Sequence, residues 1–327
     1  MAEVGIVVIG RNEGNRLAGC LQSALRTGTP VIYVDSGSTD QSVETARSLG
    51  VPVVELDASS PWGPSRARNA GAARLLRLTP GVRFIQFLDG DSELANGWIE
   101  CGVRRLESAA GVAVVCGRLR ERSPAASIYN QLCEIEWDQP VGEASACGGN
   151  CMVRADAFQQ VGGFDPSILA GEEAELCLRL RNRGWRVLRT NDEMATHDAA
   201  MTRLGQWWRR GIRSGYAYAQ GAWMHGRSPE RHFVRENMRI WTWGFAIPAV
   251  ALSAAWLSNG ISLSLLLLYP AQFYWTYRQL RRRPLPRKPA AAYAASCVLT
   301  RFPEIYGIWK FGIRQISGGP MRLIEHR

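Results

Sequence analysis

Asp89 and Asp91 stand on either side of a glycine, directly after the apolar run Phe84–Leu88, which predicts a buried strand. Two carboxylates one residue apart at a strand end lie close together with little side-chain bulk between them. Such a pair suits a hard divalent cation, Mn²⁺ or Mg²⁺, that bridges a diphosphate. Glu93 is a candidate to complete the coordination. A solvent-exposed acidic turn has the same pattern, so the assignment of a metal site depends on which other residues lie at the same edge of the sheet.

Two more polar clusters follow predicted strands. They are Arg11, Asn12 and Glu13 after Val4–Ile9, and the run Asp35–Asp40 after Val31–Val34. The carboxyl ends of parallel strands meet at one edge, where such sheets bind ligands, so we expect the clusters to converge. Ser38 and Gln41 have the spacing of a helix capping box. Asp35 has no such local explanation, and we predict that it accepts hydrogen bonds from a nucleobase or ribose.

The first 110 residues alternate between short apolar runs and helical segments. In chain order, the predicted elements are Val4–Ile9, Leu17–Arg26, Val31–Val34, Gln41–Leu49, Val51–Leu56, Ser65–Leu78, Phe84–Leu88 and Trp98–Ser108. This order predicts an α/β fold with a mostly parallel sheet covered by helices. Neither a GxGxxG motif nor a Walker A loop follows the first strand. We therefore expect a nucleotide whose phosphates are held through a metal.

Six segments resemble the inverting family-2 glycosyltransferases with the GT-A fold, a Rossmann-like mixed sheet. In order, they are VVIGRNEG, VDSGSTD, SRARNAGAA, FLDGDSE, CGGNCMVRADAFQQVGGFD and GEEAELCLRLRNRGWRV, and they cover roughly residues 4 to 197. The resemblance implies transfer of a sugar from a nucleotide-sugar donor. It also implies that Asp35 contacts the base and that Arg68 lies near the base or phosphates. Asp89 and Asp91 would contact ribose and metal, and the strip with Gly149 and Asn150 would lie beside the donor sugar.

The resemblance also places the catalytic base in an acidic pair that opens a helix. An inverting transfer needs one base to deprotonate the acceptor hydroxyl on the face opposite the leaving diphosphate. Here the pair is Glu172 and Glu173, and the second position matches the base, although the usual residue there is Asp. We predict Glu173 as the base, with Glu172 able to share the role. The alternative is that both acids only complement the helix dipole.

Three further residues are weaker candidates. His197 follows a predicted strand and is interpreted either as a further metal or diphosphate ligand or as a structural histidine. Arg209 and Arg210 follow two tryptophans and could close over a diphosphate; they also fit the solvated face of a basic helix. The surrounding residues only loosely resemble the QxxRW pattern of processive synthases, so polymer synthesis is disfavoured.

Composition excludes a disordered chain, because 46% of the 327 residues are hydrophobic and 21% are charged. The eight cysteines form no CxxC pair and are expected to be small buried hydrophobes in a reducing compartment. The six-residue apolar run at residues 4–9 has no basic leader, so no secretory signal is expected.

The C-terminal third combines an apolar run with basic residues. Eleven Lys or Arg and two Glu lie between residues 278 and 327, which gives this stretch +9 of the net charge of +10. It follows the uncharged run Ile240–Tyr277, which Ser258–Gly260 divides into two predicted short helices. This pattern favours a membrane surface over nucleic acid as partner. The hairpin would span or only dip into the bilayer, or else be buried in a soluble protein.

These observations predict a catalytic domain over residues 1–230 and a membrane-associated hairpin with a basic amphipathic tail over residues 231–327. The expected function is a non-processive, hexosyltransferase-like enzyme at the cytoplasmic face of the inner membrane. It would transfer sugar to a lipid-linked or polysaccharide acceptor of the cell envelope. The alternatives are a nucleotidyltransferase that makes sugar nucleotides, which would need a glycine-rich loop after the first strand, and a non-catalytic membrane-anchored module that binds nucleotide sugars.

Overall fold

The computed structural model describes residues 3–57 and 63–318, and it divides the chain into two compact units. The first unit comprises residues 1–122 and 136–199, and the second comprises residues 123–135 and 200–327. The second unit thus resumes at residue 200, whereas the predicted division between a catalytic domain and a membrane-associated part lies after residue 230 and stays a prediction. The helix at residues 204–225 belongs with the later helices, because glycines on it allow close packing against them. Each unit is described by itself below.

A nine-stranded mixed sheet forms the centre of the first unit, in the order β3-β2-β1-β4-β8-β6-β9-β5, with β7 paired to β9. Strands β1 to β4 run parallel, and β8 is antiparallel to both β4 and β6. The strands are β1 (Val4–Gly10), β2 (Val31–Asp35), β3 (Val53–Glu55), β4 (Phe84–Asp89), β5 (Ser92–Leu94), β6 (Val112–Glu121), β7 (Gly142–Ala144), β8 (Cys151–Arg154) and β9 (Arg186–His197). The predicted α/β class is confirmed, with a mixed sheet.

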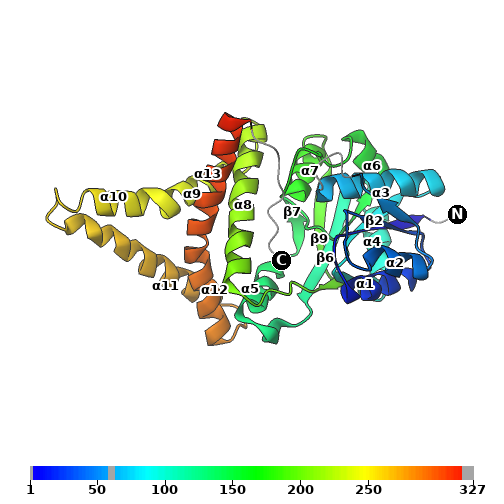
Figure 1. Ribbon diagram of the computed structural model, residues 1–327, viewed down its shortest axis with the longest axis horizontal. Coiled ribbons are helices and arrows are strands. Elements are labelled where there is room, and N and C mark those ends of the chain that lie inside the picture. The colour runs from blue at the N-terminus through cyan, green and yellow to red at the C-terminus, as the bar shows by residue number, and fades with distance from the viewer. Residues whose placement is uncertain (1–2, 58–62, 319–327) are drawn as a thin grey trace. The chain divides into compact units, whose positions relative to one another are not determined.

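Helices surround this sheet (Figure 1). They are α1 (Asn15–Leu25), α2 (Ser42–Ser48), α3 (Pro64–Leu78), α4 (Trp98–Glu107), α6 (Ala155–Gln160) and α7 (Glu172–Arg181). Nearly every residue of β1, β2 and β4 is buried, as expected for strands covered on both faces. Gly71 lets α3 approach the sheet closely, because a Cβ there would lie 2.3 Å from Cγ1 of Val7.

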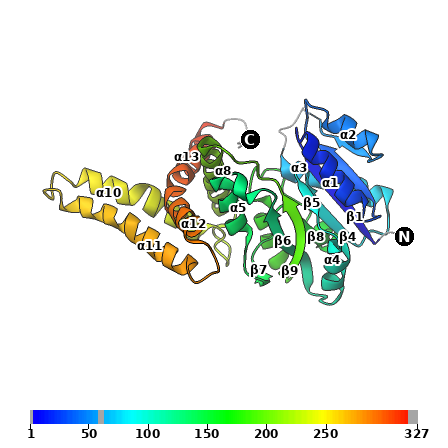
Figure 2. The ribbon, with the colours of Figure 1, turned by 90° about the horizontal axis from the view of Figure 1, so that it is seen from below.

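The second unit is helical (Figure 2). Its helices are α8 (Leu204–His225), α9 (Val234–Trp241), α10 (Ile247–Ser253), α11 (Leu268–Leu280), α12 (Arg287–Leu299) and α13 (Arg301–Ser317), with most of α5 (Ile128–Trp137) and the short turn Pro124–Ala126 before it. Helix α8 packs tightly along α13. A Cβ on Gly215 would lie 1.9 Å from the carbonyl oxygen of Glu304, and one on Gly307 would lie 2.1 Å from that of Ile212. Glycine is therefore required on both helices.

The predicted pair of apolar helices over residues 240–277 is not found in that form. The segment is divided among α9, a π-helical stretch at Thr242–Ala246, α10, a turn, a 3₁₀ stretch at Ile261–Leu267 and α11. Within the described residues, every helix is too short or too polar to cross a bilayer. Pro248 and Asn259-Gly260 explain the breaks, because proline lacks an N–H to donate and the latter two residues have positive φ. The end of the predicted basic tail, residues 319–327, lies outside the described residues.

Candidate active site

The polar clusters predicted from the sequence meet at the carboxyl ends of β1, β2 and β4. Strand β1 lies between the other two, with Gly10 paired to Asp35 of β2 and Ile9 paired to Asp89 of β4. Asp35 and Asp89 therefore flank the end of β1, where Arg11, Asn12 and Glu13 follow directly. The prediction that these strand ends bring the clusters together is confirmed by the register.

Asp35 has local partners that the sequence did not reveal. Its Oδ1 accepts hydrogen bonds from the hydroxyls of Tyr33 (2.9 Å) and Ser38 (2.5 Å), and its Oδ2 accepts from the backbone N–H groups of Gly37 (2.9 Å) and Ser38 (2.8 Å). The proposed capping box with Gln41 does not form, because Ser38 bonds to Asp35 and the N–H of Ser42 donates to Asp40 instead. Asp35 thus shapes the turn after β2.

The turns after β1 and β2 are tied together. The backbone N–H of Asn12 donates to the hydroxyl oxygen of Ser38 (2.9 Å), and Oδ1 of Asn12 accepts from the N–H of Thr39 (2.7 Å). Asn12 has a φ of 54°, a conformation in which asparagine is enriched among non-glycine residues. Glu13 is buried and pairs with Arg16 (3.1 Å). Asn12 and Glu13 therefore hold the rim in shape, and Arg11 is partly exposed beside them.

Asp89, Asp91 and His197 form a cluster suited to a metal ion. One ligand atom from each lies within 4.8 Å of the others, and Nε2 of His197 is 3.3 Å from Oδ1 of Asp91. Antiparallel pairing of β5 with β9 places His197 opposite Ser92 and so next to Asp91. Two carboxylate oxygens and an imidazole nitrogen are a donor set that Mn²⁺ and Mg²⁺ accept. The residues fit a divalent cation.

Glu93 lies outside this cluster. Its carboxylate forms an ion pair with Arg122 (2.7 Å), and it packs over Gly19 of α1, where a Cβ would lie 2.2 Å from Oε1 of Glu93. Antiparallel pairing puts Ser92 and His197 on the same face of the sheet, and Glu93, the next residue of β5, points to the other face. The prediction that Glu93 completes the coordination does not agree with this geometry.

Arg68 holds three carboxylates together. It lies on α3 with only 2% of its side chain exposed, and its guanidinium donates to Glu172 (2.7 Å) and Asp89 (2.9 Å) and pairs with Glu173 (3.2 Å). The sequence predicts a role for Arg68 near the nucleotide, and the structure adds a second role, which is to hold these carboxylates together. A single buried cation connects the strand that carries Asp89 to the first turn of α7.

The two acids that open α7 have different environments. Glu172 is buried, and one of its oxygens bonds to Arg68. Glu173 keeps 17% of its side chain exposed. Partial burial and the negative charge of Glu172 raise the pKa of Glu173 to about 7, against the opposing effect of Arg68. A carboxylate with a pKa near neutrality that still reaches solvent is suited to accept a proton.

Gly149 and Asn150 support the same site. A Cβ on Gly149 would lie 2.4 Å from Oδ2 of Asp89 and 2.6 Å from Nη2 of Arg68, so a larger residue would displace this ion pair. Asn150 is buried, accepts a hydrogen bond from the N–H of Asp89 (2.8 Å) and donates to the hydroxyl of Ser92 (3.0 Å). Asn150 therefore sets the turn that carries Asp89 and Asp91.

Sequence reasoning missed Trp137. Its ring lies edge to face with the imidazole of His197, with centroids 4.8 Å apart. It contacts a candidate metal ligand 60 residues away, and no pattern in the sequence singled it out. Arg209 and Arg210 lie on α8 in the second unit, and their role at the diphosphate stays a prediction.

Comparison with known proteins agrees with this geometry. Residues 5–162 match the family described as Glycosyl transferase family 2, and residues 135–301 match Glycosyl transferase family group 2. The chain is 25% identical to Glycosyltransferase AglE of Haloferax volcanii over 60% of this chain and 67% of that protein. It is 29% identical to the Pre-mycofactocin glycosyltransferase of Mycobacterium tuberculosis over 63% of this chain, but over only 44% of that longer protein.

Two solved structures share the fold. One is the mannosyltransferase PcManGT from Pyrobaculum calidifontis in complex with GDP-Man and Mn²⁺, with a TM-score of 0.63 and 18% identity over 94% of this chain and 87% of that one. The other is S. aureus TarS 1-349, with a TM-score of 0.53 and 15% identity over 98% of this chain and 93% of that one. At these identities the likeness is one of fold.

Proposed function

Because the chain belongs to the family-2 glycosyltransferases, we propose that it transfers a hexosyl group from a nucleotide-diphosphate sugar to an acceptor hydroxyl with inversion. The observation that carries this proposal is the position of Glu173. Its partly exposed carboxylate is joined through Arg68 to Asp89, one of the three residues suited to a divalent cation. Proton acceptor and candidate metal ligands therefore share one edge of the sheet.

In the proposed reaction, Glu173 accepts the proton of the acceptor hydroxyl as the new glycosidic bond forms and the bond to the diphosphate breaks. Its raised pKa makes it a stronger base than an ordinary carboxylate while it remains ionised in a useful fraction at neutral pH. Glu172 and Arg68 act as positioning residues. Arg68 orients the Glu173 carboxylate and limits how far its pKa rises, and Glu172 fixes Arg68.

Asp89, Asp91 and His197 would hold the divalent cation, Mn²⁺ or Mg²⁺. When bound, such an ion neutralises charge that develops on a leaving diphosphate. Asn150 and Gly149 hold the turn that presents these ligands, and Trp137 orients His197. The complex of the similar fold with GDP-Man and Mn²⁺ supports a nucleotide-sugar donor and a cation of this kind.

The proposed donor site lies along the turns after β1 and β2. Arg11, Asn12 and Glu13 form one side of it and the Asp35 turn the other, tied together by the bonds of Asn12 to Ser38 and Thr39. A nucleoside bound there would contact side chains and backbone groups that these hydrogen bonds already hold in place. We also propose that Arg209 and Arg210 bind the diphosphate, because guanidinium groups form strong hydrogen bonds with phosphate oxygens.

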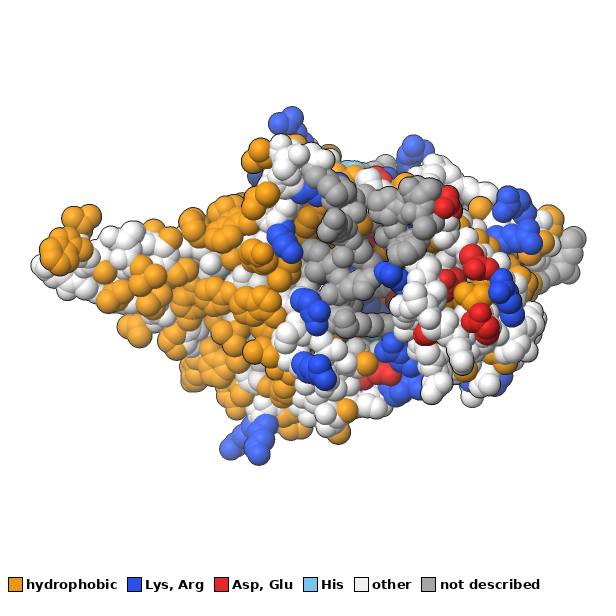
Figure 3. Space-filling model, in the orientation of Figure 1, with side chains coloured by type: hydrophobic (Ala, Val, Ile, Leu, Met, Phe, Trp, Pro, Cys, Tyr) orange, Lys and Arg blue, Asp and Glu red, His pale blue; other side chains and the backbone are white. Residues whose placement is uncertain are grey.

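We further propose that the acceptor is lipid-linked or a polysaccharide and that the enzyme works on the cytoplasmic membrane surface. The second unit supports this, since large apolar side chains such as Trp256, 92% exposed, lie at its surface. Figure 3 shows hydrophobic side chains across most of the visible face of the C-terminal elements, with Lys and Arg side chains at its margin. Such a combination is typical of membrane contact.

A panel of nucleotide sugars tests the function. The full chain should release nucleoside diphosphate from one donor class in the presence of Mn²⁺ or Mg²⁺, faster with an acceptor extract than without, and chelation should stop the release. Release of pyrophosphate from a nucleoside triphosphate and a sugar phosphate would favour a nucleotidyltransferase. Binding of nucleotide sugars without any turnover would favour a binding module. Either result would contradict the proposal.

A further inference from the structure

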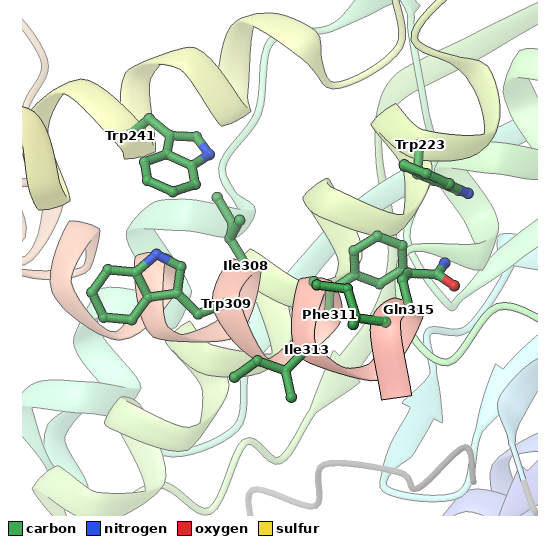
Figure 4. Close-up of a pocket in the computed structure, with 9 residues that line it drawn as sticks. Trp223, Trp241, Ile308, Trp309, Phe311, Ile313 and Gln315 are labelled. Atoms are coloured by element: carbon green, nitrogen blue, oxygen red, sulfur yellow. The ribbon is translucent and has the colours of Figure 1, made fainter. Parts of the chain in front are cut away.

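An open apolar groove lies within the second unit, between α8, α9 and the second half of α13 (Figure 4). We call it the α13 groove; its volume is about 780 Å³. Its walls include Trp223 of α8, Trp241 of α9, and Trp309, Phe311, Ile313 and Ile316 of α13. Of the nine described residues that line it, Gln315 is the one with a polar side chain. A volume of this size falls in the range of about 300–1,000 Å³ that holds small ligands.

Ring contacts connect the aromatic residues that line the groove. The ring of Phe245 packs against both Trp241 and Trp309, with each pair of centroids 5.6 Å apart. Phe311 packs edge to face on Tyr216 at 5.4 Å and lies 6.4 Å from Trp223. Ring contacts therefore connect the aromatic lining residues to one another and to Phe245 and Tyr216, and the groove is present without a ligand. A preformed apolar groove indicates a ligand with apolar surface.

The charge of the second unit indicates which charge the ligand carries. Residues 200–318 contain 17 Lys or Arg and three Glu, whereas residues 1–199 contain 20 Lys or Arg and 25 Asp or Glu. The second unit is thus strongly basic and the first is acidic. One cation that neighbours the lining residues in the chain contacts α8. Arg314 lies between the lining residues Ile313 and Gln315 and donates to the hydroxyl of Tyr216 (2.5 Å), whose ring supports Phe311.

We infer that the α13 groove binds a hydrocarbon chain of an anionic bilayer lipid, with the phosphate of its headgroup attracted by Arg314 and the basic unit around it. The inference rests on the membrane association proposed above and makes it specific for lipid charge. The apolar lining removes the chain from water, and burial of apolar surface is the main favourable contribution to binding of such a group. The charge complementarity then selects an anionic headgroup over a neutral one.

The tryptophans in the walls provide a direct assay. Dodecyl phosphate with a brominated chain, used below its micelle concentration, should quench the tryptophan fluorescence of the full chain in a saturable way. Ile313→Asp places a carboxylate in the groove at a side chain that is 65% exposed, so the fold should tolerate it. We expect it to weaken binding at least about tenfold, because a charge cannot be buried against the chain without cost.

Leu257→Asp is the matched control, since Leu257 is also apolar, lies in the same unit and is 86% exposed, but does not line the groove. It should leave dodecyl phosphate binding unchanged. Arg314→Gln should reduce the preference for dodecyl phosphate over dodecanol by about tenfold and leave dodecanol binding intact. Dodecyl phosphate should also release the wild-type protein from vesicles containing phosphatidylglycerol.

Three results would overturn the inference. They are unsaturable quenching of the wild type, equal weakening by Leu257→Asp and Ile313→Asp, and equal affinity for dodecanol and dodecyl phosphate. Cleavage of the nucleotide sugar, measured on the same samples without lipid, separates a failure of this inference from a failure of the proposed function.

Discussion

Replacement of Arg68 tests whether one buried cation organises the site. Arg68→Met keeps much of the side-chain length but removes the charge that faces Glu172, Glu173 and Asp89. Glu172 is buried and would be left without its cation. Removing one partner of a buried ion pair typically costs about 3–5 kcal/mol. We expect a loss of this size in the free energy of unfolding of the first unit.

Urea titration followed by circular dichroism measures this loss, with Arg47→Met as the control. Arg47 pairs with Glu55 at 2.5 Å, but both side chains are more than half exposed. An exposed pair contributes no more than about 1 kcal/mol, so this variant should be close to wild type. Arg68→Met combined with Glu172→Gln should recover part of the lost stability, because the substitution removes one of the unpaired buried charges.

The same substitution should alter the pH dependence of turnover. Arg68 lowers the pKa of Glu173, so removing Arg68 should raise that pKa and move the rising limb of the pH–rate profile to higher pH. If Arg68→Met unfolds at the same urea concentration as Arg47→Met and keeps the wild-type profile, the account of Arg68 is wrong.

Three further results are expected. Asp91→Ala should abolish metal-dependent nucleoside diphosphate release while circular dichroism stays unchanged; retention of wild-type rates with Mn²⁺ would exclude the metal role. Gly149→Ala should lower turnover about 10–100-fold, because its Cβ would collide with Asp89, whereas Gly148→Ala, with nothing within 4 Å, should not. In the wild type, kcat/KM should rise with pH through about 7 as Glu173 loses its proton, and a flat profile between pH 6 and 8 would contradict its role as base.

Much of the fold followed from local pattern. The buried runs at Val4–Ile9, Val31–Val34 and Phe84–Leu88 became β1, β2 and β4 within one residue at each end. The polar residues directly after these runs predicted where the candidate site lies, because parallel strands end at one edge of the sheet. The acids of the first turn of α7 also followed from sequence, through their resemblance to a family motif.

The contacts within the site could not be predicted from local sequence pattern, because they join residues that are distant in the chain. Arg68 meets Glu172 across 104 positions, and the ring of Trp137 meets His197 across 60. The capping box of Ser38 with Gln41 was misjudged for a different reason. Ser38 has two local options, to cap a helix or to bond to Asp35, and only the geometry of the turn decides between them.

The apolar segment was also misjudged. The predicted turn at Ser258–Gly260 is present, but the helices on its two sides are not continuous, because a π-helical stretch precedes Pro248 and the 3₁₀ stretch Ile261–Leu267 precedes α11. The charge contrast between the two units was visible in the sequence, but it became informative only once the boundary at residue 199 was known.

The most direct test of the account compares Glu173→Gln with Glu172→Gln in transfer to an acceptor, with donor binding measured in parallel. Glu173→Gln keeps the size of the side chain and removes the basic carboxylate, so we predict unchanged donor binding and a fall in transfer of about 10²–10⁴-fold. Glu172→Gln should retain the larger share of activity, because Glu172 acts only through Arg68. An inactive Glu172→Gln beside a nearly normal Glu173→Gln would contradict the account and assign the base to Glu172.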